Sequence, residues 1–191
     1  MVSQFTSPHT VRLLGDLDFK FPEGIHAVGR LDNDSEGLLI LTTNKKVTKL
    51  LFEGKTPHVR TYLVQINRVL SEENLERLKS GVTIKIRSGE NYITPPCTVS
   101  ILSHPEKLYQ LEDRATAYPP YTWISISLTE GKYHQVRKMI TAIGHKTKRL
   151  IRVSIENLDL AELKSSEVKE MNEKEFFEKL KIQWVQPNSF G

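Results

Sequence analysis

Residues 29–37 have the sequence Gly-Arg-Leu-Asp-Asn-Asp-Ser-Glu-Gly, and the apolar run Leu38–Leu41 follows directly. This segment places three carboxylates, those of Asp32, Asp34 and Glu36, between two glycines. Glycine gives the backbone the freedom that a tight loop needs, and loops are where a scaffold presents reactive groups. Three acidic residues within five positions are not typical of a buried β-strand. We therefore expect a loop that enters a buried strand and offers one of the three carboxylates for chemistry.

Length and composition are those of a folded protein. The chain has 191 residues, of which 38% are hydrophobic. That is enough for one large domain over residues 1–191, or for two small halves that share a core. No apolar run approaches the roughly 20 residues of a membrane-spanning helix, and the first residues lack the charged and apolar regions of a signal peptide. The sequence therefore predicts a cytoplasmic protein with no membrane partner.

Metal sites are not expected. Cys97 is the single cysteine, so it can form neither an internal disulfide nor a CxxC zinc site, and the six histidines are scattered. The acids of residues 32–37 do occupy the first, third and fifth positions of an EF-hand calcium loop, with glycine at the sixth. The twelfth position, however, is Thr43 where a bidentate glutamate is required, and a β-prone run replaces the rest of the loop.

Paired carboxylates are also the catalytic groups of many hydrolases. They can serve there as general acid and base, or as nucleophile and acid. The spacing of the acids in residues 32–36 does not exclude such an enzyme, although nothing else in the sequence resembles a sugar cleft. This alternative stays open on the spacing alone.

The positive charge is concentrated in one part of the chain. The formal net charge is +4, but residues 132–152 contain seven lysines and arginines and no aspartate or glutamate. Clustered cations favour a polyanionic partner, because they neutralise phosphates and release counterions. The alternative is an ordinary solvated basic face, which charge alone does not exclude.

The hydrophobic pattern predicts short helices and strands in irregular alternation. Strands are expected over residues 38–42, 59–66, 98–102, 123–128 and 149–155, and helices over 44–54, 71–81, 136–144 and 172–180. In the third of these helices, apolar residues recur at the spacing of one helical face, as Val136, Met139, Ile140 and Ile143. Because strands with hairpin spacing outnumber crossover helices, we predict an α+β fold with a mostly antiparallel sheet flanked by helices.

Three blocks of sequence, in the same order, resemble one enzyme family. They are Gly29-Arg30-Leu31-Asp32-x-x-Ser35-x-Gly37-Leu38-Leu39-x-Leu41-Thr42-x-Asn44, then Arg60-Thr61-Tyr62-Leu63-Val64, then Glu130-Gly131-Lys132-Tyr133-His134-Gln135-Val136-Arg137-Lys138-Met139 with Leu150-x-Arg152 after it. These are similar to the motifs of the pseudouridine synthases, in the RsuA-like branch that modifies ribosomal RNA. The resemblance covers nearly the whole chain, and it is strongest to the short RluE-type members that lack an S4 domain.

The resemblance implies a fold, a reaction and a partner. The pseudouridine synthase fold has a mostly antiparallel mixed sheet in two subdomains flanked by helices, with the active-site cleft between them. Such an enzyme detaches uracil from its ribose, rotates the base and rejoins it through carbon, so the resemblance implies no cofactor and no metal. The implied substrate is a uridine of ribosomal RNA, that of the large subunit (23S), which is single-stranded or flipped out of the stack. We expect the protein to act as a monomer.

The resemblance also implies roles for four residues. Asp32 matches the catalytic nucleophile, which must be ionised to attack. Arg137 matches the basic residue that pairs with this aspartate and keeps it charged. Tyr62 matches the active-site tyrosine, whose ring can stack on uracil and whose hydroxyl can help to remove the proton from C5. Leu150 matches the apolar residue that lines the base pocket.

Further residues are expected to hold the RNA around this pocket. Basic candidates for phosphate contacts, together with two polar ones, are Arg30, Lys132, His134, Gln135, Lys138, Arg149 and Arg152. Each functional assignment has a structural alternative: an aspartate in a loop can be a turn residue, a strand tyrosine or leucine can be core, and a helix arginine can be solvated. Asp34 and Glu36 receive no chemical role.

The sequence departs from the family pattern at its start. It has no room for an S4-type RNA-binding domain, and the family's first strand, which contains Asn-Lys-Pro, is absent before Met1. We therefore expect a missing first strand, which would leave a neighbouring strand unpaired. A second function stays open as well: a non-catalytic RNA-binding module that serves ribosome assembly.

Overall fold

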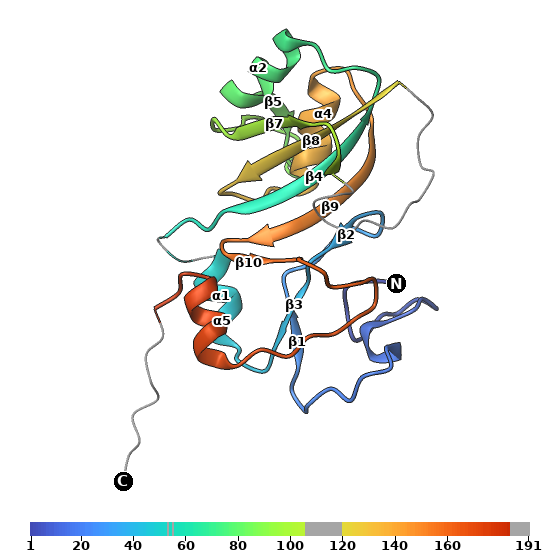
Figure 1. Cartoon of the computed structure of the whole chain (residues 1–191), viewed down its shortest axis with the longest axis vertical. Coiled ribbons are helices and arrows are strands. Elements are labelled where there is room, and N and C mark those ends of the chain that lie inside the picture. The colour runs from blue at the N-terminus through green and yellow to red at the C-terminus, as the bar shows by residue number, and fades with distance from the viewer. Residues whose placement is uncertain (53, 55, 106–119, 184–191) are drawn as a thin grey trace.

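The chain forms an α+β fold with two cores, as predicted from the resemblance (Figure 1). The computed structural model describes residues 1–52, 54, 56–105 and 120–183. The strands are β1 (His26–Val28), β2 (Glu36–Gly37), β3 (Ile40–Thr42), β4 (Arg60–Asn67), β5 (Thr83–Lys85), β6 (Asn91–Ile93), β7 (Thr98–Leu102), β8 (Tyr121–Leu128), β9 (Thr147–Ile155) and β10 (Leu158–Asp159). The helices are the 3₁₀-helix η1 (Leu14–Asp16), α1 (Lys46–Phe52), α2 (Glu72–Ser80), α4 (Gln135–Ala142) and α5 (Glu173–Lys179).

A mixed, mostly antiparallel sheet forms the centre of the molecule. Its strands lie in the order β10-β9-β4-β8-β7, with all neighbours antiparallel, and β2 adds a parallel pairing to β9. The three longest strands, β4, β8 and β9, are therefore adjacent. Alternation along β4 explains this position, because Val64 and Ile66 face one core while Leu63 faces a cluster on the opposite side. A strand with apolar residues on both faces belongs inside a sheet.

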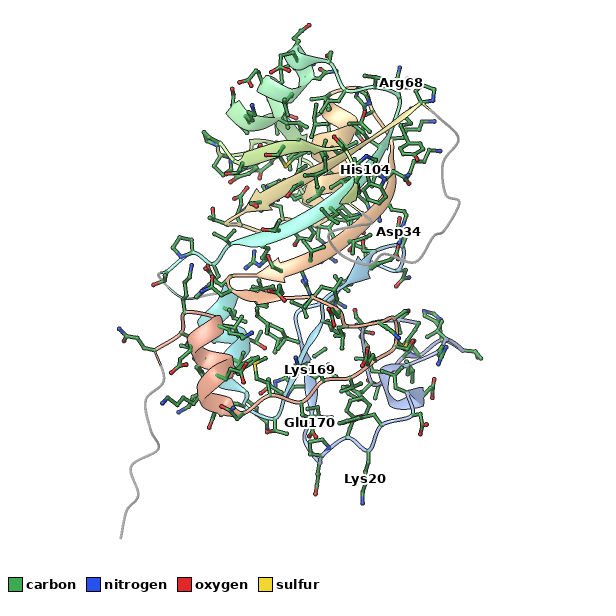
Figure 2. The ribbon with its side chains drawn as sticks, in the orientation of Figure 1. Lys20, Asp34, Arg68, His104, Lys169 and Glu170 are labelled. Carbon is green, nitrogen blue, oxygen red and sulfur yellow. The ribbon has the colours of Figure 1, made fainter. Side chains whose placement is uncertain are left out.

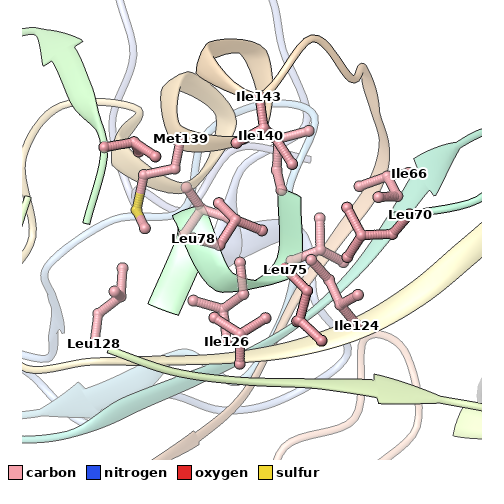
Figure 3. Packing of buried hydrophobic residues seen from close by; sticks show 14 of the residues in the cluster. Ile66, Leu70, Leu75, Leu78, Ile124, Ile126, Leu128, Met139, Ile140 and Ile143 are labelled. Carbon is pink, nitrogen blue, oxygen red and sulfur yellow. The ribbon is translucent and has the colours of Figure 1, made fainter. Parts of the chain in front are cut away.

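The first core lies between one face of this sheet and helices α2 and α4. Figure 3 shows side chains of α4 meeting those of α2 and β8. The predicted stripe on α4 supplies Met139, Ile140 and Ile143, all of which are buried. Leu78 enters the same core from α2, whose first turn is capped where the Ser71 hydroxyl accepts from the Asn74 backbone N–H. The helical spacing of the apolar residues thus fixes which face α4 turns toward the sheet.

A second core is built from the N-terminal strands and the last helix. Its buried members come from β1, β3, α1, α5, the end of β9, β10 and adjoining residues: Val28, Leu38, Ile40, Val47, Leu51, Ile155, Leu158, Phe177, Leu180 and Ile182. In Figure 1, α1 and α5 lie at one end of the sheet and α2 and α4 at the other. The last helix is capped at its start, because Asn172 Oδ1 accepts from the Glu175 backbone N–H at 2.9 Å. The two largest clusters of buried residues thus lie at opposite ends of the molecule (Figure 1).

A buried carboxylate joins the ends of three segments in this second half. Glu156, in the turn after β9, accepts a hydrogen bond from the Val59 N–H at 2.6 Å, and the Lys181 ammonium lies 2.7 Å from it. His58 Nδ1 lies 3.5 Å from the same carboxylate. Burial by itself would raise the pKa of Glu156, but these donors and charges outweigh it and hold the pKa below its ordinary value. The carboxylate is thus stabilised in its charged form.

We expect Glu156→Gln to lower the free energy of unfolding by about 1–3 kcal/mol at neutral pH. Because folding lowers the pKa of Glu156, its stabilisation is present above the unfolded value of 4.5 and is lost as the pH falls through the folded value. The stability difference between wild type and variant should therefore shrink below pH 4.5. Urea denaturation across this range measures it, with the exposed Glu178→Gln as control. A difference that stays constant with pH would contradict this role.

Candidate active site

A cleft of about 800 Å³ lies where the two halves of the molecule meet. Its walls come from the loop before β2, the segment from α1 into β4, the loop between β8 and α4, and the middle of β9. Eight of the residues singled out from the sequence line it: Arg30, Asp32, Tyr62, Lys132, His134, Gln135, Leu150 and Arg152. The three sequence blocks, far apart along the chain, thus converge on one cavity.

Asp32 is held in this cleft by a short, well-bonded loop between β1 and β2. The Ser35 N–H donates to the Asp32 carbonyl at 2.9 Å, which closes a tight turn. On the other side, the Ser3 hydroxyl donates to the Leu31 carbonyl and accepts from the Leu31 N–H, at 3.1 and 3.0 Å. Both flanks of Asp32 are therefore fixed by hydrogen bonds, and about one third of its carboxylate side chain remains exposed to the cleft.

His134 is the side chain that contacts the Asp32 carboxylate. Its Nε2 lies 3.3 Å from Asp32 Oδ1. The residue precedes α4 in the left-handed region, with φ of 53°, which is uncommon for a residue other than glycine. Its ring stacks on Tyr133, with centroids 3.9 Å apart, and Lys138 Nζ lies 5.2 Å from the centre of the Tyr133 ring. The sequence had suggested His134 only as an RNA contact, and the structure brings it to the candidate nucleophile.

Arg137 does not make the predicted ion pair with Asp32. Its Nη2 lies 3.0 Å from the Asp34 carboxylate and also donates to the Asp34 carbonyl and the Ser35 hydroxyl, at 2.8 and 3.1 Å. The position of the two residues at the start of α4 explains this difference. His134, which precedes the helix, contacts Asp32. Arg137 lies about one helical turn later and therefore contacts Asp34, two residues further along the loop. Figure 2 shows Asp34 beside β2, at the end of this loop. Asp34, which received no role from the sequence, anchors the arginine.

Tyr62 and Leu150 lie on neighbouring central strands and line the floor of the cleft. Tyr62 pairs with Arg152 across β4 and β9, and Leu150 pairs with Val64 two positions along. Both side chains pack against the first core, so their placement follows from the sheet register. Tyr62 therefore shares a face of β4 with Val64 and Ile66.

Two buried arginines flank Tyr62 in the cleft wall. Arg152 is 4% exposed and donates from Nε to the Leu38 carbonyl at 2.9 Å. Arg60 is 6% exposed, lies 4.6 Å from the centre of the Phe52 ring and reaches the Leu51 carbonyl at 3.4 Å. Burial lowers the pKa of both guanidinium groups below their ordinary value. Sequence reasoning missed Arg60, although its position two residues before Tyr62 on an alternating strand was the available signal.

The loop between β8 and α4 is fixed by a network around Glu130. This carboxylate accepts from the Gln135 amide and the Tyr92 hydroxyl, both at 2.6 Å. The hydrogen bond from Tyr92 to Glu130 raises the pKa of Tyr92. Gln135 also accepts from the Lys132 N–H at 2.7 Å, so both ends of its amide are engaged within the protein. Gln135 was expected to contact RNA, and here it is buried and positions the loop instead.

Arg149 was also expected to contact RNA at the surface, but its side chain is buried. It is 6% exposed and makes a two-pronged ion pair with Glu36, with Nε and Nη2 each 3.0 Å from a carboxylate oxygen. The parallel pairing of β2 with β9 brings these two residues together. Glu36, which also received no role from the sequence, therefore joins the candidate loop to the central sheet.

The described residues contain neither a candidate metal cluster nor a helix able to span a membrane. No group of three or more histidine, cysteine, aspartate or glutamate side chains among them could hold a metal ion. Within the same ranges, no helix is long and apolar enough to cross a membrane.

Residues 8–142 match the sequence profile of the RNA pseudouridylate synthases, which is more than half of the chain. The chain belongs to this family. It is 36% identical over 173 residues to the ribosomal large subunit pseudouridine synthase E of Vibrio vulnificus, covering 90% of this chain and 70% of the relative. It is 34% identical to the enzyme of the same name from Vibrio parahaemolyticus, covering 89% of this chain and 69% of the relative. The family and enzyme class predicted from the sequence are confirmed.

A solved structure supports the pseudouridine synthase fold. The structure, described as a pseudouridylate synthase, superposes with a TM-score of 0.68 at 28% sequence identity and covers 85% of this chain. The match spans 63% of the solved chain. The cleft described above therefore lies within a pseudouridine synthase fold.

Proposed function

We propose that this pseudouridine synthase converts a uridine of large-subunit ribosomal RNA, 23S, to pseudouridine, with Asp32 as the nucleophile. The observation that carries the proposal is the Asp32 carboxylate, fixed by its loop and open to a cleft that also contains Tyr62 and Leu150. The names of the two Vibrio relatives support the ribosomal substrate. The protein acts as a monomer, in the cytoplasm, where it meets this RNA.

The reaction balances without a cofactor. The Asp32 carboxylate attacks the ribose C1′ or the uracil ring, and the N1–C1′ bond breaks. After the base rotates, C5 bonds to C1′, and the bond from the Asp32 oxygen to C1′ or to the ring breaks, which frees the carboxylate. The proton on C5 then leaves and N1 takes up a proton. A uridine within a stacked helix is out of reach, so the substrate enters the cleft as a flipped-out or unstacked nucleotide.

The side chains near Asp32 divide the remaining tasks. Tyr62 stacks on the uracil and its hydroxyl assists removal of the C5 proton, while Leu150 packs against the base. His134 holds the Asp32 carboxylate by the 3.3 Å contact and fixes its orientation. Arg137 acts one step away, since it holds the loop through Asp34. Arg30 and Lys132, which line the cleft, and Lys138, which lies beside the Tyr133 ring, contact phosphates of the RNA.

The test is conversion of an RNA transcript by the purified protein. We expect one uridine in a 23S transcript to become pseudouridine, detected by carbodiimide modification and primer extension, without any added cofactor. Release of free uracil would instead indicate the hydrolase alternative. Binding of the transcript without any conversion would contradict the proposal and favour the RNA-binding module for ribosome assembly.

A further inference from the structure

The cleft wall contains an unusual concentration of buried nitrogen atoms that lack hydrogen-bond partners. Among the described residues, five buried side-chain polar atoms have no partner, and three of them belong to cleft-lining residues: His58 Nδ1, Arg60 Nε and Arg152 Nη2. All three side chains are at most 6% exposed. Buried polar groups are normally paired, so each of these sites calls for an explanation.

The two guanidiniums have no carboxylate to neutralise them. Among the described residues, no ion pair joins Arg60 or Arg152 to an acid, and the acids nearby are engaged elsewhere. Glu130 accepts from Tyr92 and Gln135, and Asp32 contacts His134. The third acid, Glu156, lies behind His58 and is held by Val59 and Lys181.

Two desolvated cations in the wall of one cleft are unfavourable in the free protein. Each gives up hydration, and the two repel each other, since the charge of Arg60 is one of the influences that lower the pKa of Arg152. Arginine nevertheless stays protonated under ordinary conditions. An arrangement of this kind costs stability unless an anion completes it, and such local costs concentrate at binding sites.

We propose that Arg60 and Arg152 form a buried anion site that takes the phosphate of the RNA backbone adjoining the target uridine. Resting on the proposed function, this adds a phosphate subsite inside the cleft. The planar guanidinium offers parallel N–H donors that match phosphate oxygens, and the unpartnered Nε of Arg60 and Nη2 of Arg152 are the free donors. Tyr62 pairs with Arg152 across β4 and β9 and lies two residues from Arg60 on β4, so the phosphate is held beside the base that Tyr62 contacts.

The close fit around Arg60 supports a ligand at this place. Its Nη1 lies 3.2 Å from the position that a side-chain Cβ would take at Gly131, so the loop between β8 and α4 approaches the guanidinium closely. The ring of Phe52 covers another side of the guanidinium at 4.6 Å. The group is thereby oriented by its neighbours while its Nε donor stays unpaired.

The first test compares Arg60→Met with Arg87→Met, which removes the same charge from the exposed turn between β5 and β6. Binding of the 23S transcript is measured by filter retention between about 50 and 200 mM salt. We expect Arg60→Met to weaken binding by about 10- to 100-fold and to reduce the slope of log K against log salt by about 1. Its melting temperature should be no lower than that of wild type, because a desolvated charge is removed. Arg87→Met should leave affinity near wild type.

The second test keeps the wild-type protein and changes the RNA. In a short RNA around the mapped uridine, a neutral methylphosphonate replaces one backbone phosphate at a time. We expect one position adjoining the uridine to weaken wild-type binding about 10-fold or more and to have no further effect on Arg60→Met. This coupling does not depend on how the variant folds.

Three results would overturn the proposal. The first is that Arg60→Met and Arg87→Met bind the transcript with equal affinity and equal salt slope. The second is that no methylphosphonate position weakens binding of the wild type while leaving binding of Arg60→Met unchanged. The third is lost turnover with unchanged binding, which would place the pyrimidine ring, and not a phosphate, at the arginines. Because binding is measured without turnover, failure of the anion site is distinguishable from a wild-type protein that forms no pseudouridine.

Discussion

Asp32→Asn is expected to reduce pseudouridine formation by at least about 10³-fold, because the amide has the shape of the carboxylate but is not a nucleophile. The loop should keep its structure, since its hydrogen bonds use the Asp32 and Leu31 backbone and the Ser3 hydroxyl. RNA affinity should therefore stay close to wild type. Release of tritium from 5-³H-uridine in a 23S transcript measures the rate, and filter retention measures the affinity.

Asp34→Asn is the control for Asp32→Asn, because it removes a neighbouring carboxylate of the same loop that is not the nucleophile. The Asp34 side chain is 68% exposed, and its ion pair with Arg137 is partly solvated. An ion pair of this kind contributes up to about 1 kcal/mol, so we expect less than about a tenfold loss of rate. Full activity in Asp32→Asn, or a larger loss in Asp34→Asn than in Asp32→Asn, would contradict the assignment of the nucleophile.

Gly37→Ala is expected to lower the free energy of unfolding by about 3 kcal/mol or more. Gly37 has φ of 105°, and a Cβ there would lie 2.2 Å from the Arg152 carbonyl oxygen and 2.7 Å from the Arg152 nitrogen. Both neighbours are backbone atoms of a central strand, so they cannot move aside as a side chain would. The parallel pairing of β2 with β9 would have to separate, and the Asp32 loop would lose its attachment to the sheet.

Gly89→Ala is the matched control for this substitution. Gly89 also has a positive φ, of 89°, but nothing lies within 4 Å of the Cβ position. Its replacement should cost only the left-handed backbone, about 1 kcal/mol. Urea denaturation of both variants measures the comparison. Equal losses of stability would show that close approach to Arg152 is not what requires glycine at position 37.

Local patterns predicted those elements whose own residues determine them. The predicted apolar stripe on α4 is present, and the helices expected over residues 71–81 and 172–180 form as α2 and α5. The helix expected over residues 44–54 forms as α1, with Val47 and Leu51 buried and Leu50 38% exposed. Periodicity and capping act over a few residues, so a single sequence contains this information.

The pairings that the sequence missed depend on how distant segments meet. The two-residue strand β2 is too short for any periodicity, and its parallel partner β9 lies more than 100 residues away. That pairing brings Glu36 to Arg149, and the phase of α4 brings Arg137 to Asp34 rather than Asp32. Arg60 resembles a solvent-facing strand residue until the Phe52 ring and the Gly131 loop are placed around it. The three motifs therefore predicted which residues line the cleft, but not which of their side chains contact one another.

The most direct test of the account is a pseudouridine map of the ribosomal RNAs from the source organism, with and without this gene. We predict that one uridine of 23S ribosomal RNA becomes unmodified when the gene is removed. Wild-type protein should restore the modification, and Asp32→Asn, expressed to the same level, should not. Identical maps with and without the gene, or restoration by Asp32→Asn, would contradict the central claim.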